Sequence, residues 1–186
     1  GSMADLDAAT LDDVREWFRT YYGAANAVLV LAGDIDVHTA RAKAEQYFGH
    51  NAPGPAVTRP GVWIAARTDS RRETIYDQVA QPRWQRYWNT PPDNTRDSEY
   101  LGLVGEILGG GKTSRLYERL VYRERLADGV GAGQSSLEIA GLFMLSADVK
   151  QGVAVERVEA AMMEELQRFI EKGPTKAELE RARIAM

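Results

Sequence analysis

Two side chains seven residues apart, Arg115 and Tyr122, have the chemistry to hold a peptide by its backbone. A predicted α-helix begins at Thr113 or Ser114, and seven steps of roughly 100° place both residues on one face, about 10 Å apart along the axis. Arg119 lies between them on the same stripe. Guanidinium and phenol groups both donate hydrogen bonds to carbonyl oxygens, which favours substrate binding. The alternative is a solvated helix face, where arginine and tyrosine are common.

The run Gly109–Thr113, with three glycines before a lysine and a threonine, invites comparison with a phosphate-binding loop. Such loops use glycine amides to cradle phosphates and a lysine to meet their charge. The first glycine of that motif would stand at position 106, which is Glu106, and the run follows a predicted helix where the motif requires a strand. The run therefore predicts a tight turn between two helices, for which glycine supplies the backbone freedom.

An aromatic and basic run, Arg83–Trp88, has the composition of a base-stacking platform. The chain as a whole carries 27 acidic and 23 basic residues and a net charge of -4, which argues against a broad surface for nucleic acid. The run is better explained as a strand with one core face and one polar face. Asp34 and Asp36 are explained as turn and helix-cap residues rather than as a catalytic acid pair.

Metal and thiol chemistry have little support in the composition. The chain has no cysteine, which excludes disulfides, thiol nucleophiles and thiolate zinc sites. Its two histidines, His38 and His50, are twelve positions apart, so they do not share a helix face as paired zinc ligands do. No apolar run approaches the roughly 18 residues that span a bilayer. The sequence predicts no metal site of its own.

The elements that would position these residues fall into two groups. Residues 1–3 look like a tag remnant, and residues 4–48 predict a helix from Thr10, a buried strand over 27–32 and a helix capped by Asp36. About 48 residues are too few to cover a sheet, so we interpret 4–48 as the C-terminal part of a preceding α/β domain. Residues 49–60 are rich in proline and glycine and predict a linker.

Residues 61–186 predict a second domain of the α+β class. An extended segment over 73–90 is interrupted by Pro82 and followed by a helix capped by Asp97 or Ser98. Strands are predicted over 129–136 and 141–149, then a long amphipathic helix that ends at Gly173–Pro174. Thr175 and Glu178 form a capping box for one more helix, and no stop signal follows it before Met186. We therefore expect this domain to be truncated at its C-terminus.

Two stretches carry a family resemblance. Phe18–Asp34, with Tyr21, Tyr22 and Gly23, resembles the final strand region of the first domain in the pitrilysin and insulinase family of zinc proteases. Leu108–Tyr122 is similar to the glycine-rich turn and helix of that family's second domain. The resemblance covers the whole chain after the tag remnant.

The resemblance implies a mostly antiparallel sheet packed against helices in each of two domains that enclose a peptide chamber. In that family one domain holds zinc through an inverted histidine and glutamate motif, which this chain lacks. The opposite domain supplies an arginine and a tyrosine that hold the substrate, and the resemblance transfers these roles to Arg115 and Tyr122. Asp128 stands where many relatives have a tyrosine.

The resemblance thus predicts the substrate-gripping portion of a zinc-dependent peptidase that is inactive by itself, with Tyr122 catalytic and zinc held in a missing domain or a partner subunit. The alternative is a catalytically dead scaffold of the same family. The expected partners are a peptide substrate and the zinc-binding domain, not nucleic acid, and self-association through the front segment is a further option. Resemblance to bacterial members suggests a periplasmic or secreted location.

Overall fold

The structure is a computed structural model that describes residues 2–186. The chain divides into two compact units, one that ends at Pro60 and one that runs from Gly61 to Met186. The expected tag remnant falls partly outside the described residues, because Gly1 is not among them; Ser2 caps the first helix and Met3 begins it.

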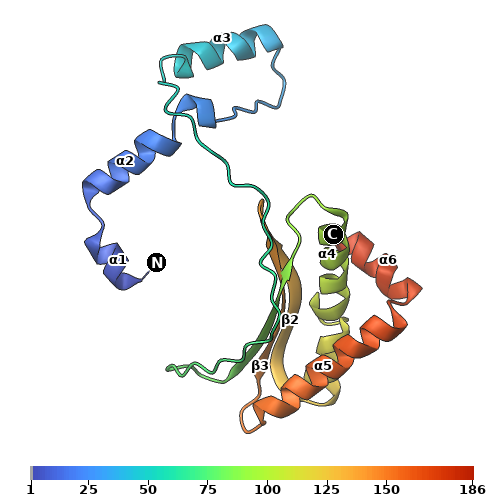
Figure 1. Ribbon diagram of the computed structural model, residues 1–186. Helices are drawn as coiled ribbons and strands as arrows, with labels where there is room; N and C mark the ends of the chain where they lie inside the picture. Colours follow the sequence, from blue (N-terminus) through green and yellow to red (C-terminus); the bar gives the residue numbers. More distant parts are fainter. Residues whose placement is uncertain (1) are drawn as a thin grey trace. The chain divides into compact units, whose positions relative to one another are not determined.

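The first unit consists of short helices and extended chain (Figure 1). Its elements are α1 (Met3–Ala8), α2 (Leu11–Tyr21), the short 3-10 helix η1 (Ala24–Asn26) and α3 (Val37–Phe48). The 3-10 helix η1 is tied to the later proline-rich stretch, since the backbone N–H groups of Ala24 and Ala25 donate to the carbonyls of Ala52 and Pro53 at 3.0 and 2.9 Å. Thr10 and Asp13 form the predicted capping box, and Asp36 caps α3 as predicted.

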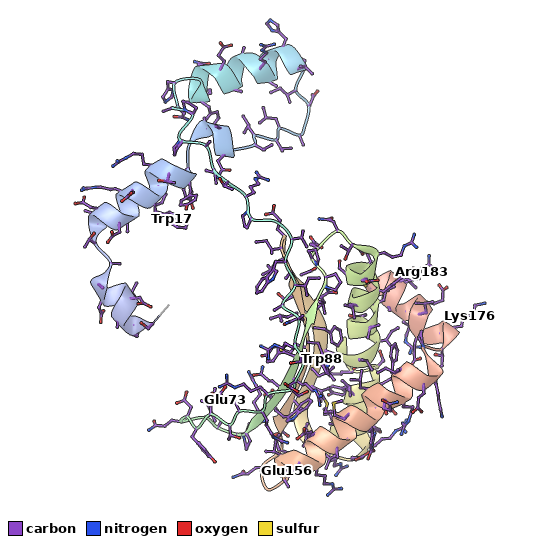
Figure 2. All side chains as sticks on the ribbon, in the orientation of Figure 1. Trp17, Glu73, Trp88, Glu156, Lys176 and Arg183 are labelled. Carbon is purple, nitrogen blue, oxygen red and sulfur yellow. The ribbon has the colours of Figure 1, made fainter. Side chains whose placement is uncertain are left out.

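No described residue of this first unit is buried. Large apolar side chains such as Trp17 on α2 stand in solvent (Figure 2). The prediction of a buried strand over 27–32 is wrong for this structure: Val28 is 87% exposed, and the segment is extended without pairing to any described residue. The physical reason is that a strand needs a partner for its backbone groups and a covering layer for its side chains, and about sixty residues supply neither.

The second unit is built on a three-stranded antiparallel sheet in the order β1-β3-β2. The strands are β1 (Arg83–Thr90), β2 (Ala127–Ser136) and β3 (Gly141–Val149). Alternate β3 residues, from Phe143 to Val149, are buried, while the residues between them face the open side of the sheet. Of the extended segment expected over 73–90, only the part after Pro82 forms a strand.

Four helical elements accompany this sheet, and they lie on one side of it (Figure 1). They are α4 (Arg96–Gly109), η2 (Tyr117–Arg123), α5 (Val155–Lys172) and α6 (Lys176–Ala185). On α6, Lys176 and Arg183 point away from the sheet (Figure 2). The largest fully buried side chains form one core between the helices and the sheet: Leu108, Leu116, Leu120, Leu126, Leu145, Met162, Val149 and Val158. This arrangement is the α+β architecture that the sequence predicts.

Helix α4 packs directly on β2 through two glycines one turn apart, Gly105 and Gly109. A Cβ atom added at Gly109 would collide with the backbone of Ala132, and one at Gly105 would lie 2.8 Å from the Cα of Gly133. The turn that follows α4 uses Gly111 at φ +99°, a conformation that favours glycine. The glycine run therefore forms the turn that the sequence predicts, and Gly109 also makes a close contact that the sequence does not predict.

Candidate functional site

Arg115 lies just before η2 and is held inside the second unit. Its Nε–H donates to Glu178 Oε1 at 2.7 Å, and its Nη2 group donates to Glu178 Oε2 at 2.8 Å and to the carbonyl of Gly173 at 2.9 Å. The guanidinium also lies 5.1 Å from the ring centroid of Phe169. Only 16% of the Arg115 side chain is exposed. Arg115 therefore joins the start of η2 to the connection between α5 and α6.

Glu178 accepts hydrogen bonds from two directions. Besides Arg115, it accepts from the backbone N–H and the hydroxyl of Thr175, at 2.7 and 2.8 Å, as the carboxylate of the predicted capping box. The hydrogen-bonded Arg115 guanidinium, aided by Thr175, lowers the pKa of Glu178 from its ordinary 4.5 to about 2, although burial opposes this change. The carboxylate is therefore charged at every pH near neutral.

The helix that begins near Ser114 takes an unexpected form. After Arg115 and Leu116, residues Tyr117–Arg123 form a π-helix rather than the α-helix that the sequence predicts. The backbone N–H of Glu124 donates to the carbonyl of Arg119, five residues back, at 2.9 Å. Two ion pairs have the same spacing of five residues, Arg119 with Glu124 and Arg123 with Glu118. A π-helix brings such residues together one turn apart.

Arg119 braces the π-helix against α5. It donates to Glu124 Oε1 at 2.7 Å, to Glu164 Oε2 at 2.6 Å and to the carbonyl of Ala161 at 3.2 Å. A further charge contact of 3.7 Å joins it to the buried carboxylate of Glu165. Three acceptors on two elements fix one guanidinium, so η2 has little freedom to unwind.

Tyr122 has a different environment from both arginines. Its side chain is 73% exposed, and its hydroxyl has no hydrogen-bond partner among residues 2–186. The expectation that Arg115 and Tyr122 share one face relied on α-helical angles, which do not apply across a π-helix. The structure directs Arg115 towards α6 and leaves Tyr122 in solvent. Of the predicted pair, only the phenol is free to touch another molecule.

The described part of the chain offers no group of three or more histidine, aspartate or glutamate side chains arranged to hold a metal ion. The described residues therefore do not supply a set of ligands for zinc, which the family resemblance places in the other domain. No helix among residues 2–186 has the length and hydropathy of a membrane span.

The sequence did not reveal the partners of these arginines. Glu178 was recognised only as a capping residue, because its contact with Arg115 joins positions 63 residues apart. Charge pairs at a spacing of five, such as Glu118 with Arg123, are a local signal in the sequence for the form of this helix. In an α-helix residues five apart point in different directions, so repeated opposite charges at that spacing favour a π-helix.

A family profile described as "Peptidase M16 inactive domain" matches residues 8–186. The chain belongs to this family. The M16 inactive domain is a non-catalytic domain of zinc-protease proteins, and membership agrees with the resemblance to the pitrilysin and insulinase proteases. The residues that carried the resemblance, Phe18–Asp34 and Leu108–Tyr122, both lie within the matched range.

The chain is similar to parts of longer proteins. "Zinc protease PqqE" of Helicobacter pylori is 23% identical over 187 residues, which cover 99% of this chain and 42% of PqqE. "Non-peptidase homolog YmxG" of the same organism is also 23% identical, over 98% of this chain and 42% of YmxG. The crystal structure of a peptidase M16 inactive domain from Pseudomonas fluorescens superposes with a TM-score of 0.84 at 23% identity, over 96% of this chain and 43% of that chain. The chain thus spans less than half the length of these relatives.

Proposed function

We propose that this chain is the half of a zinc-dependent peptidase that does not bind zinc, and that Tyr122 holds the peptide substrate. Membership of the M16 inactive-domain family and the printed name of PqqE, a zinc protease, support the general role. One observation carries the finer proposal: an exposed phenol without a partner stands on a π-helix that Arg119 braces. Short π-helical turns occur frequently at functional sites.

In the proposed reaction the phenolic O–H of Tyr122 donates a hydrogen bond to the carbonyl oxygen of the peptide bond that is cleaved. A zinc ion held by another domain would supply the Lewis acidity that activates water and polarises that carbonyl. As water attacks, negative charge develops on the oxygen, and a donor fixed in advance stabilises this charge more than it stabilises the ground state. The bracing of η2 by Arg119 fixes the backbone that carries Tyr122, which limits the reorganisation that the donor needs.

Arg115 takes a positioning role in this proposal rather than a direct contact with peptide. Its Nε and Nη2 donors are engaged by Glu178 and Gly173. Releasing the guanidinium to bind a substrate would leave a largely buried carboxylate without its partner, which costs free energy. Arg115 instead fixes the chain two residues before η2 begins, and it thereby influences Tyr122 indirectly.

The proposed partner of the first unit is the zinc-binding domain. Residues 27–32 form an apolar extended segment, exposed and without strand pairing in the described structure. Such a segment gains hydrogen bonds and buries apolar surface when it joins a sheet. We propose that it completes the sheet of the zinc-binding domain. Pairing with a second copy of this chain is the competing outcome.

The experiment uses a protein in which this chain is joined to its zinc-binding domain. Tyr122→Phe keeps the ring and removes one donor, so we expect kcat for a fluorogenic peptide to fall on the order of 10²-fold with little change in stability. Tyr100→Phe is the matched control, because Tyr100 is also an exposed tyrosine of the second unit and makes no hydrogen bond within residues 2–186. Equal activity of the two variants would refute the role of Tyr122.

The second candidate function is a scaffold without peptidase activity. The relative named "Non-peptidase homolog YmxG", which is 23% identical to this chain as PqqE is, favours it. The two candidates differ in zinc content. A stoichiometric zinc ion and chelator-sensitive hydrolysis in the joined protein support the peptidase, whereas metal-free protein with intact folding supports the scaffold.

A further inference from the structure

The strand β2 forms one edge of the sheet. It pairs with β3 along its whole length, and no other strand among residues 2–186 pairs with its opposite side. In an extended strand alternate residues direct their N–H and C=O groups to opposite sides. Roughly half of the backbone groups of β2 are therefore available along an edge of ten residues, about 33 Å long.

Folded proteins normally protect such an edge with lysine, proline or a covering segment. Residues Gly129–Ser136 contain no charged residue and no proline. The other edge of the sheet, at β1, differs: it carries Arg83 and Arg86, and the extended chain before Pro82 runs near it, where the Asn89 side chain donates to the carbonyl of Ala65 at 2.8 Å. The unprotected edge is the one at β2.

The open face of β2 leaves its backbone uncovered. Gly129, Gly131 and Gly133 pair with the β3 residues that face away from the helices, so they share that open face. A Cβ atom added at Gly133 would meet nothing within 4 Å. One added at Gly131 would lie 2.9 Å from Ser146 Oγ and one at Gly129 3.3 Å from Asp148 Oδ2, so the open space on this face lies beside Gly133. The glycines make the edge accessible, but they do not by themselves identify a ligand.

Asp128 is the residue of β2 that would favour one class of side chain on an added peptide. The pairing register shifts between Ala127 and Gly129, so Asp128 is an extra residue opposite β3. A bulge of this kind turns a side chain away from the regular pattern and is common beside binding sites. The Asp128 carboxylate is exposed and has no hydrogen bond or ion pair within the described residues. Nearby Asp148, in contrast, is paired with Arg83 at 2.7 Å.

We propose that an extended peptide adds to the sheet as a strand beside β2, with a lysine or arginine side chain of that peptide next to Asp128. Backbone hydrogen bonds along the edge would supply sequence-independent affinity, and the one uncompensated carboxylate would select a basic residue at the bulge. This inference rests on the proposed function, namely that the domain receives peptide, and it names the strand and the side-chain class that it prefers.

The test uses the 186-residue chain and fluorescein-labelled peptides of eight alternating threonine and valine residues, with one position changed to lysine or to glutamate. We expect the lysine peptide to bind more tightly than the glutamate peptide. Amide NMR signals of Gly129–Ser136 should shift on binding. Two further peptides carry N-methyl groups on either the odd-numbered or the even-numbered residues. Only one of these two sets of N–H groups faces β2, so one methylated peptide should lose binding and the other should keep it.

Variants of Asp128 separate the contribution of its carboxylate to peptide binding from that of backbone pairing along the β2 edge. Asp128→Asn should weaken binding of the lysine peptide by roughly threefold, the size expected for an exposed ion pair, and Asp128→Lys should reverse the preference between the two peptides. Asp7→Asn is the matched control, because Asp7 is an exposed aspartate of α1 that makes no interaction within the described residues. Thermal unfolding of each variant verifies that it is folded.

Three results would overturn the inference. Peptide could bind without shifting the NMR signals of β2, or methylation of odd and of even peptide residues could weaken binding equally. Alternatively, Asp128→Lys could leave the preference for the lysine peptide unchanged. β2 signals that shift with protein concentration alone would identify a second copy as the occupant and would also refute it. The proposed function is judged separately by the Tyr122→Phe activity, since loss of turnover in that variant does not depend on where β2 signals move.

Discussion

Residues 2–60 and residues 61–186 carry similar local signals but differ in what they bury. Each unit has a helix opened by a capping box, at Thr10 in the first and at Thr175 in the second. In the second unit an amphipathic helix covers a sheet, and leucines such as Leu145 are completely buried. In the first unit the equally amphipathic α2 leaves Trp17 57% exposed. Local signals are thus sufficient for helices, while a core requires a sheet to cover.

The largest expected contrast between the units is in their apolar side chains. Leu145→Ala should lower the free energy of unfolding by about 3 kcal/mol, because it opens a cavity in the centre of the sheet. Trp17→Ala should change it by less than about 0.5 kcal/mol, although the removed side chain is larger. Urea unfolding of both variants provides the comparison. If Trp17→Ala lowered the free energy of unfolding by more than about 1.5 kcal/mol, roughly half the effect of Leu145→Ala, the first unit would have a core.

An intermediate effect is expected from the ion pair between Arg115 and Glu178. Glu178→Gln should destabilise the second unit by about 2 kcal/mol at pH 7, because it leaves a partly buried guanidinium without its charged acceptor. Arg183→Ala is the control, since both side chains of its bridge to Glu180 on the same helix are exposed.

The pH dependence of this pair has a definite sign. The pKa of Glu178 is about 2 in the folded protein and near 4.5 otherwise, so its contribution is fully present above pH 4.5 and is lost as the pH falls towards 2. The stability difference between wild type and Glu178→Gln should therefore shrink over that range. A difference that stays constant from about pH 6 to about pH 2.5, which covers most of the interval between the two pKa values, would contradict the assigned pairing.

The smallest contrast concerns the two capping boxes. Thr175→Ala should cost about 1 kcal/mol in unfolding of the second unit, because α6 contributes the buried Ala182 to the core. Thr10→Ala should leave that transition unchanged and only reduce helical circular dichroism, since α2 belongs to no buried cluster. Equal effects on the cooperative transition would indicate that both helices fold with one core.

The sequence predicted the features that depend on neighbouring residues. The capping residues Thr10 and Thr175, the strand Gly141–Val149 and the end of α5 at Gly173 all have local signals, and the structure contains them. The π-helix was missed because the angular argument assumed 3.6 residues per turn. The partner of Arg115 was missed because side-chain contacts across 63 positions depend on how the helices pack, which no local pattern specifies.

The segment 27–32 shows a different limit of prediction. Its apolar, partly β-branched composition correctly indicates an extended chain with a tendency to pair. Composition alone does not supply the neighbouring strand, and within the described residues none pairs with it. The sequence of an edge strand and that of an unpaired extended segment therefore look alike, and only the presence of a neighbouring strand distinguishes the two.

Hydrogen exchange of residues 27–32 tests the central claim most directly, because that claim assigns the first unit to a zinc-binding domain. The measurement compares this chain as a verified monomer with the protein in which it is joined to that domain. We expect exchange within seconds to minutes in the monomer and protection of at least about 10³-fold after joining, as paired strands become part of a cooperative core. Strong protection already in the monomer, or none in the joined protein, would contradict the account.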